Sequence, residues 1–367
     1  MKMPGEFARH ERTVICWPTR LSVYGEHISE ARAAHAALAR TISGFEPVTM
    51  IANPGDGDDA RERCGSTVDV VEIPIDDSWF RDSGPIYVVE GGRRVATNWT
   101  FNGWGGKFSP IDADVEVARR WAAHAGHEVR DIDMVLEGGS ITSDGERFLA
   151  TTEQCLLNPN RNPSMSKDAI EAKLVAELGM PEVIWLPHGL SLDEDTDGHV
   201  DNVAIFIAPG VMVMQGCADR SLVDHERLIE NRRVAERFGV TIREIPVLPT
   251  ITYHGARVQV PYLNFYLVNG GAIVPVCGHP DDDEMLALLA RAQLLPRGHR
   301  CHRLFTLRTP DTGSVLVLVG WGEVTTKGCD TGECKFRCVA AQPSMPHTRT
   351  HHAIEVHQHT QARHGQI

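Results

Sequence analysis

The chain has 367 residues, a net charge of −13 and 42% hydrophobic residues, an ordinary globular composition that is long enough for two domains or one large domain of repeated units. The acidic balance argues against a nucleic-acid partner, because phosphate binding needs clustered lysine and arginine, and it favours small cationic ligands. Residues 1–20 lack the apolar core of a signal peptide, and no apolar run approaches the ~20 residues of a membrane helix. The nine cysteines are odd in number and scattered, so we expect reduced thiols in a cytoplasmic protein.

Amphipathic or alanine-rich segments alternate with short apolar runs along the chain. Ser166 or Asp168 is a candidate cap for the third helix, and Gly179 and Gly239 are natural helix stops. The predicted helices are 29–42, 112–125, 164–179, 218–239 and 281–295. The predicted strands are "TVICW", "PVTMIA", "VDVVEIPI", "PIYVV", "RFLATT", "EVIWLP", "VAIFIA", "VMVMQG", "AIVPV" and "VLVLVG".

Each predicted helix is followed by a polar turn that contains glycine. The five turns are "RDSGP", "LEGGS", "DTDGH", "NGGAI" and "VGWGE", roughly 50 to 70 residues apart, a spacing longer than that of the common solenoid repeats. Five helix-and-strand units with one turn in each favour a closed, pseudo-symmetric α/β arrangement in which the turns converge on a central cavity.

The densest group of polar residues lies in "IPIDDSWFRDSGPIYVV". Trp79 and Asp82 on one tight turn would offer a flat apolar wall and a carboxylate, which suits a planar cation. The alternative is an ion-paired turn around a core tryptophan. Asp76 in the same segment and Trp104 in "NWTFNGWGGKF" are further candidates for the wall of such a pocket.

Two later turns add candidate side chains. Glu137 precedes Gly138 and Gly139 after an apolar strand, where its carboxylate is either a turn acceptor or part of a pocket. In "DTDGHVDN" we expect an extended backbone, which would place His199 and Asp201 on one face because residues i and i+2 of a strand point the same way. The alternative is a polar turn that enters a buried strand.

Several long motifs, in order from about residue 3 to about residue 295, resemble those of the agmatine deiminases. They are "MPGEFARHERTVICWPTR", "DDSWFRDSGPIYV", "TFNGWGGKF", "LEGGSI", "DGERFLATTEQCLLNPNRNPSMSKDAIE", "WLPHGLSLDEDTDGHVDNVAIF" and "LNFYLVNGGAIVPV". That family belongs to the Porphyromonas-type peptidylarginine deiminase group of the guanidine-modifying (pentein) superfamily. The resemblance implies a five-bladed α/β propeller with the active site in a central channel.

The resemblance also implies roles for individual residues. Asp82 and Asp201 match the carboxylates that hold the guanidinium, and His199 matches the general acid/base. Trp79 matches the stacking wall, and Glu137 matches the acidic position of the "EGG" turn. The implied reaction is deimination of agmatine through a covalent amidino-cysteine intermediate, without a metal or organic cofactor. The alternatives are another guanidino substrate, an amidine-transferring relative, or a homologue that binds guanidines without turnover; a homodimer is a family-level expectation.

The C-terminal part departs from the family pattern, in which the nucleophilic cysteine follows a glycine run. Here "RCVAAQP" is the nearest match and makes Cys338 the candidate nucleophile, with Cys329 and Cys334 as substitutes. We therefore expect a catalytic domain over residues 1–345 with a divergent last blade from residue 298, and a flexible histidine-rich tail over 346–367. A competing hypothesis is a zinc site, although the spacing of its cysteines is not that of a zinc finger. Its ligands would be Cys329, Cys334, Cys338, His347, His351 and His352.

Overall fold

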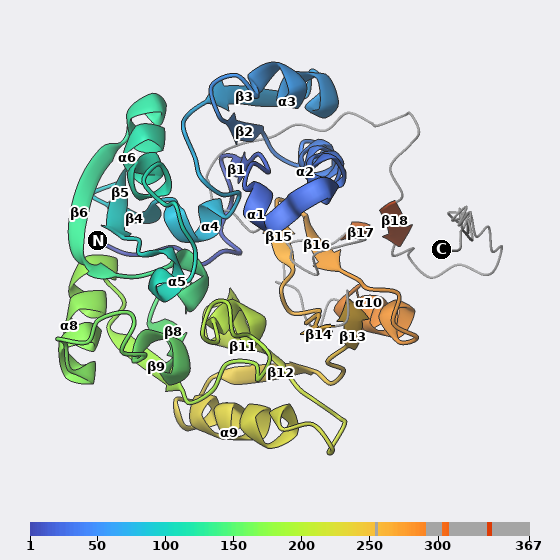
Figure 1. Ribbon diagram of the computed structural model, residues 1–367. Helices are drawn as coiled ribbons and strands as arrows, with labels where there is room; N and C mark the ends of the chain where they lie inside the picture. The colour runs from blue at the N-terminus through green and yellow to red at the C-terminus, as the bar shows by residue number, and fades with distance from the viewer. Residues whose placement is uncertain (254–255, 291–302, 308–335, 340–367) are drawn as a thin grey trace, which may run out of the picture.

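The computed structural model describes residues 1–253, 256–290, 303–307 and 336–339, the last two segments by their backbone only. Its strands form separate small sheets, and Figure 1 shows the sheets and their helices following one another in chain order around a common centre. We refer to these groups as units one to five. The predicted strand "VLVLVG" and the zinc-site residues Cys329, Cys334, His347, His351 and His352 lie outside the described residues.

Unit one has a sheet in which all three strands are parallel, in the order β1-β2-β3. Every residue of β1 and β2 is buried, as is typical of parallel strands covered on both faces. The elements are β1 (Thr13–Cys16), α1 (Leu21–Tyr24), η1 (Gly25–His27), α2 (Ile28–Ile42), β2 (Val48–Ala52), α3 (Gly57–Cys64) and β3 (Val68–Glu72).

Units two to four share one plan, in which an antiparallel hairpin is followed by a helix and a strand parallel to the hairpin's second strand. A short helical turn precedes the first strand of each unit. Unit two contains α4 (Phe80–Ser83), β4 (Ile86–Glu90), β5 (Arg93–Thr100), α5 (Gly103–Gly106), α6 (Asp114–Ala125) and β6 (Glu128–Val135). Unit three contains η2 (Gly138–Ser140), β7 (Ile141–Ser143), β8 (Phe148–Thr152), α7 (Glu153–Leu156), α8 (Lys167–Leu178) and β9 (Glu182–Leu186). Unit four contains η3 (Val200–Asn202), β10 (Ala204–Ala208), β11 (Val211–Gln215), α9 (Asp224–Arg237) and β12 (Thr241–Ile245).

The fifth unit repeats the hairpin, helix and parallel strand and adds an antiparallel fourth strand. A separate hairpin connects it to unit four. The elements are β13 (Thr250–Tyr253), β14 (Ala256–Gln259), β15 (Tyr266–Val268), β16 (Gly271–Pro275), α10 (Asp282–Ala290), β17 (Arg303–Leu307) and β18 (Phe336–Val339).

Each hydrophobic cluster contains residues of more than one unit. One cluster joins units two and three, another joins three and four, and another joins four and five. The remaining one contains unit one together with Trp121 of unit two and Tyr266 of unit five. Since each unit buries its apolar surface against its neighbours, we expect the units to fold and unfold together.

A buried polar network joins units one and five. The Glu46 carboxylate accepts hydrogen bonds from the Thr13 hydroxyl at 2.5 Å, from His10 Nδ1 at 3.0 Å and from the backbone N–H of Asn269 at 2.8 Å. Burial opposes a charge on His10, but the contact with Glu46 outweighs burial and raises the pKa of His10. The predicted turn "NGGAI" is the β15–β16 hairpin, and its Asn269 is hydrogen-bonded to unit one and to the segment before it.

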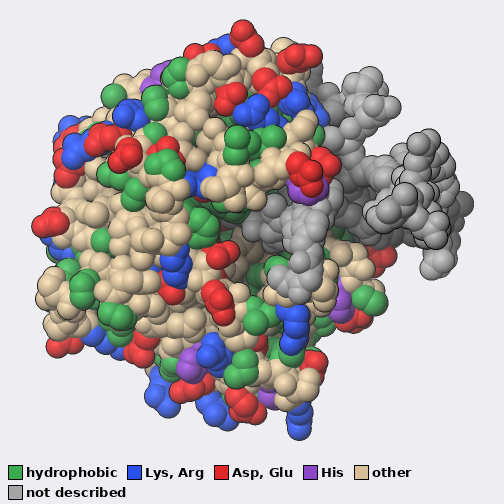
Figure 2. Space-filling model, in the orientation of Figure 1, with side chains coloured by type: hydrophobic (Ala, Val, Ile, Leu, Met, Phe, Trp, Pro, Cys, Tyr) green, Lys and Arg blue, Asp and Glu red, His purple; other side chains and the backbone are tan. Residues whose placement is uncertain are grey.

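On the face drawn in Figure 2, acidic and basic side chains are interspersed, and acidic side chains lie beside a hollow near its middle. Among the helices that the structure describes, none is both long and apolar enough to span a lipid bilayer.

Candidate active site

Three of the predicted polar turns meet because they occupy the same place in successive units. Asp82 lies in α4, directly before the first strand of unit two. Glu137 precedes η2 and Asp201 lies in η3, directly before the first strands of units three and four. Contacts join α4 to η2 and η2 to η3. The repeated order of elements thus brings residues 55 and more positions apart into one site.

Gly139 lies at the centre of this site. A Cβ atom on Gly139 would stand 2.5 Å from Nδ1 of His199 and 2.8 Å from both Oδ2 of Asp201 and Oδ1 of Asp82. The three side chains therefore meet beside the Cα atom of Gly139, in the space that a methyl group on this residue would fill. Glycine is needed there because any side chain would occupy the space in which they meet.

Asp82 is held rigidly through both carboxylate oxygens. Oδ1 accepts a hydrogen bond from the backbone N–H of Gly139 at 2.9 Å, and Oδ2 accepts one from Nε1 of Trp104 at 3.0 Å. Trp104 is buried, has left-handed backbone angles, and packs against the edges of Phe101 and Phe108. Because each carboxylate oxygen has two lone pairs, Asp82 keeps acceptor capacity for a ligand.

His199 is buried at the start of η3, and its backbone N–H donates to Oδ2 of Asp193 at 3.1 Å. Its Nδ1 lies 3.9 Å from Oδ1 of Asp82, and its Nε2 is buried without a hydrogen-bond partner. Burial alone would keep the ring neutral, but Asp82, Cys155 and Asp201 together raise the pKa of His199 well above its ordinary value. His199 is therefore suited to hold a proton for a leaving group.

Glu137 is fully buried and is paired with an arginine. Nε of Arg161 donates to Oε1 of Glu137 at 2.7 Å, while Oε2 has no hydrogen-bond partner. Burial raises the pKa of Glu137, although His199 and Arg161 oppose that shift. Arg161 also donates to Oδ2 of Asp197 at 2.7 Å and to the backbone carbonyl of Thr196 at 3.0 Å, so it ties Glu137 to the turn that carries His199.

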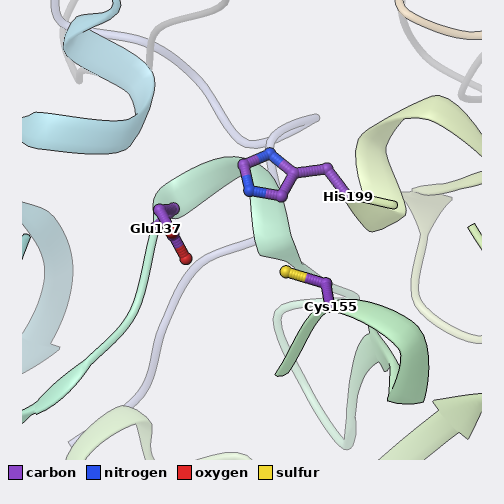
Figure 3. Close-up of side chains that lie close together, drawn as sticks. All are labelled: Glu137, Cys155 and His199. Atoms are coloured by element: carbon purple, nitrogen blue, oxygen red, sulfur yellow. The ribbon is translucent and has the colours of Figure 1, made fainter. Parts of the chain in front are cut away.

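Cys155 lies beside these groups on α7. Figure 3 shows the side chains of Glu137, Cys155 and His199 pointing toward one another, and one ligand atom of each lies within 4.8 Å of the others. The Thr152 hydroxyl at the start of α7 donates to the backbone carbonyl of Gly198 at 2.5 Å, which joins α7 to the histidine turn. Burial raises the pKa of the Cys155 thiol, opposed by His199, so this cysteine is a poor thiolate nucleophile at rest.

Asp201 is the partly buried carboxylate of the site. Burial and the neighbouring carboxylates of Asp82 and Asp193 raise its pKa to about 7, against the opposing charges of His199 and Arg81. In the folded protein Asp201 thus holds its proton to far higher pH than in an unfolded chain. Its contribution to folding stability is present at low pH and is lost as the pH rises through about 7.

We expect Asp201→Asn to stabilise the protein above pH 7, by about 2 kcal/mol. Above that pH Asp201 is ionised in the folded protein, where burial and the neighbouring carboxylates destabilise its charge, whereas asparagine carries no charge. Chemical denaturation of both proteins at pH 5 and pH 8 measures the difference in the free energy of unfolding. Asp219→Asn is a matched control, since two hydrogen bonds from Ser221 lower the pKa of Asp219 and its charge does not change over that range. An Asp201→Asn difference that is equal at both pH values would contradict the prediction.

The structure places the other predicted site residues as follows. The Trp79 backbone carbonyl accepts a hydrogen bond from the backbone N–H of Asp82 at 3.0 Å, as expected for one tight turn. The side chain of Trp79 is partly buried and packs against the hydrophobic cluster that contains unit one. Asp76 is not brought to Gly139; its carboxylate accepts from the backbone N–H of Ala113 at 2.7 Å. Cys338 pairs with Phe305 between β18 and β17, and its side chain is outside the described part of the chain.

Two features of the site differ from the sequence expectations or are absent from them. Residues 200–202 form a 3-10 turn, so His199 and Asp201 meet at Gly139 through that turn and not through strand alternation. Arg161 was missed because it lies in the asparagine- and proline-rich loop "NPNRNP", whose nearest acidic partners are distant in sequence. Its only sequence signal is an arginine in a loop otherwise made of turn residues.

Comparisons with known proteins agree with these motifs. The family model for Porphyromonas-type peptidyl-arginine deiminase matches residues 2–298. The agmatine deiminase of Pseudomonas aeruginosa (strain LESB58) is 38% identical over 322 residues, covering 79% of this chain and 87% of that protein. The structure of the Enterococcus faecalis agmatine deiminase catalysing its reaction superposes with a TM-score of 0.77 at 29% identity, over 84% of this chain and 90% of that one. A cysteine-to-serine variant of C. jejuni agmatine deiminase with substrate bound gives a TM-score of 0.76 at 28% identity, over 84% and 90% of the two chains. This chain belongs to the Porphyromonas-type peptidyl-arginine deiminase family.

Proposed function

We propose that this protein is a hydrolase that converts agmatine and water into N-carbamoylputrescine and ammonia. The observation that carries the proposal is the convergence of Asp82, Asp201 and His199 on Gly139, with Glu137 beside them. Acidic residues that face one buried point suit a small cation with several N–H donors. Relatives and solved structures named agmatine deiminase support the same reaction.

We also propose that the five units form a five-bladed α/β propeller. The shared hydrophobic clusters between successive units and the polar network between units one and five support a closed ring. In such a ring the turns before the first strands of units two, three and four would line the central channel.

The guanidinium of the substrate stays protonated at neutral pH and presents a planar set of N–H donors. In this proposal Asp82 and Asp201 accept from its two edges, and Trp79 provides the stacking face. Trp104 acts through Asp82, because its indole N–H fixes the carboxylate. Glu137 supplies its unpartnered Oε2 as a further acceptor.

The reaction then proceeds in two steps. A cysteine thiolate attacks the guanidinium carbon, ammonia leaves with a proton from His199, and a covalent amidino-thioether remains. Water that has given a proton to His199 attacks the same carbon, the C–S bond breaks, and the thiolate is released with the urea product. We propose Cys338 as the nucleophile, and no metal or organic cofactor takes part.

The first test is ammonia release from agmatine by the wild type beside the Cys338→Ser variant. We expect an active wild type and an inactive variant. An active variant would show that another cysteine, such as Cys329 or Cys334, is the nucleophile. If the wild type is inactive, calorimetry with agmatine separates a guanidine-binding homologue from a wrong assignment of the substrate, and arginine and peptidylarginine are the next substrates to assay.

We expect Gly139→Ala to lower kcat/KM for agmatine by roughly 100-fold, because a displacement of about 1 Å in a catalytic constellation has an effect of that size. The added methyl would push His199, Asp201 and Asp82 apart. The backbone of Gly139 is not left-handed, so alanine is compatible with the local fold. Gly44→Ala is the control, since its nearest neighbour would be the Thr41 carbonyl at 3.4 Å. Full activity of Gly139→Ala would refute the convergence of the three side chains.

A further inference from the structure

Cys155 has no role in the proposed reaction, yet it lies among residues that do. Glu137, Cys155 and His199 come from three separate segments, the residue before η2, α7 and the residue before η3. Their exposed fractions are 0%, 0% and 2%. One carboxylate oxygen, Sγ and one ring nitrogen lie within 4.8 Å of one another, and Figure 3 shows all three side chains directed at a common space.

Two of these side chains carry buried polar atoms without hydrogen-bond partners. They are Oε2 of Glu137 and Nε2 of His199. Buried polar atoms are normally satisfied, so this pair points to an occupant of the space between them. The second polar atom of each side chain has a neighbour outside this space. Oε1 of Glu137 accepts a hydrogen bond from Arg161, and Nδ1 of His199 lies 3.9 Å from Oδ1 of Asp82.

The donor set is one imidazole nitrogen, one thiol sulfur and one carboxylate oxygen. This combination is typical of Zn²⁺, whereas Mg²⁺ and Ca²⁺ prefer oxygen ligands alone. Ligating histidines usually donate their other ring N–H to a carboxylate, and here the Asp82 carboxylate lies 3.9 Å from Nδ1 of His199, within reach of a small side-chain shift. Tetrahedral zinc bonds of about 2.0–2.3 Å need ligand atoms about 3.5 Å apart, so side-chain shifts of roughly 1 Å would close the site.

We propose that Glu137, Cys155 and His199 form a binding site for Zn²⁺ that excludes the guanidino substrate. Coordination displaces the thiol proton of Cys155, and any proton on His199, to solvent. The metal then binds Oε2 of Glu137 and Nε2 of His199, so neither atom is free for the proposed reaction. Zinc is thus an inhibitor of the reaction proposed above and not a resident cofactor.

The site is tested by titrating the metal-free protein with Co²⁺, which reports tetrahedral sulfur ligation by its visible and near-ultraviolet absorption. We expect a cobalt–thiolate band that added Zn²⁺ abolishes. Cys155→Ser should weaken cobalt binding by roughly 100-fold or more, since even outer partners of a metal ligand contribute 10–100-fold. Glu137→Gln is a second variant that keeps the shape of the site and should also weaken binding.

Two controls locate the signal. Cys217→Ser removes a buried thiol of unit four that donates to the Asp219 carbonyl, and it should leave the cobalt band intact. A variant with both Cys329→Ser and Cys334→Ser should also keep the band. A band that survives Cys155→Ser, or that is lost only in the double variant, would overturn the proposal, as would the absence of any thiolate band in the wild type.

The competition between metal and substrate rests on the proposed function and is measured separately. We expect agmatine to displace cobalt and zinc to inhibit ammonia release, each rate being normalised to the zinc-free rate of the same protein. A wild type that binds cobalt through Cys155 but releases no ammonia would refute the proposed function alone. A wild type that releases ammonia and gives no thiolate band would refute the metal site alone.

Discussion

Asp82→Asn is expected to lower kcat/KM for agmatine by about 1,000-fold, or about 4 kcal/mol, which is the range for truncating one partner of a buried charge pair. The charge that attracts the guanidinium is lost. In addition, both oxygens of Asp82 already accept hydrogen bonds, one from the backbone of Gly139 and one from Trp104. An amide has only one acceptor oxygen, so its NH₂ group must face one of these two donors in either orientation.

The measurement is steady-state ammonia release together with calorimetric binding of agmatine. Trp104→Phe is the matched variant, because it removes one donor and keeps both the Asp82 charge and an aromatic ring. We expect a loss for Trp104→Phe of roughly 10- to 100-fold, since it frees the carboxylate without neutralising it. Unchanged kinetics in Asp82→Asn would remove Asp82 from the substrate site, and equal losses in both variants would show that orientation, not charge, is the dominant effect.

The recurrence of glycine-bearing polar turns after the predicted helices led to the expectation that these turns converge, and three of them meet at Gly139. Asp82, Glu137 and His199 each lie within two residues of a glycine and shortly before a β-strand, which marks a turn at the edge of a sheet. The same argument failed for Asn269, since a glycine-bearing polar turn is also typical of a β-hairpin. Only the strand order of unit five distinguishes the two.

Elements with mixed polarity were the hardest to predict. The strand β6, "EVRDIDMV", is partly exposed and carries four charged residues, and the helix α3, "GDDARERC", has little apolar periodicity, so neither was expected. Asp76 was assigned to the pocket because of its neighbours Trp79 and Asp82, whereas its carboxylate caps backbone near α6. Proximity in sequence does not fix the direction of a side chain, which depends on packing partners distant in the chain.

The partners of Glu137 could not be predicted for the same reason. Arg161 is 24 residues from Glu137, and Cys155 is 44 residues from His199. Both contacts arise because α7 and the loop after it are hydrogen-bonded to the turns of units three and four. The apolar setting of Cys155 in "TEQCLL" is equally typical of an ordinary core thiol.

Arg161→Met is expected to destabilise the protein by about 3–5 kcal/mol, because it removes one of the two cations beside the buried Glu137 carboxylate and the donor that hydrogen-bonds to its Oε1. The side chains of Arg161 and Glu137 are both fully buried, so water cannot replace the lost contact. Asp197, the other acidic partner of Arg161, keeps Lys107 at 2.6 Å and Asn160 at 2.9 Å, and therefore stays paired. The predicted loss thus comes from Glu137, and chemical denaturation of the wild type and the variant measures it.

The double variant Arg161→Met with Glu137→Gln separates stability from catalysis. Removing the carboxylate charge as well should recover most of the lost free energy of unfolding, because a neutral amide is far cheaper to bury than an unpaired anion. Ammonia release should remain low in the double variant, since both the carboxylate charge that attracts the guanidinium and the arginine that orients the side chain at position 137 are lost. If the double variant is no more stable than Arg161→Met, the arginine stabilises the fold mainly through the Thr196 carbonyl and the turn that carries His199, and not through its pair with Glu137.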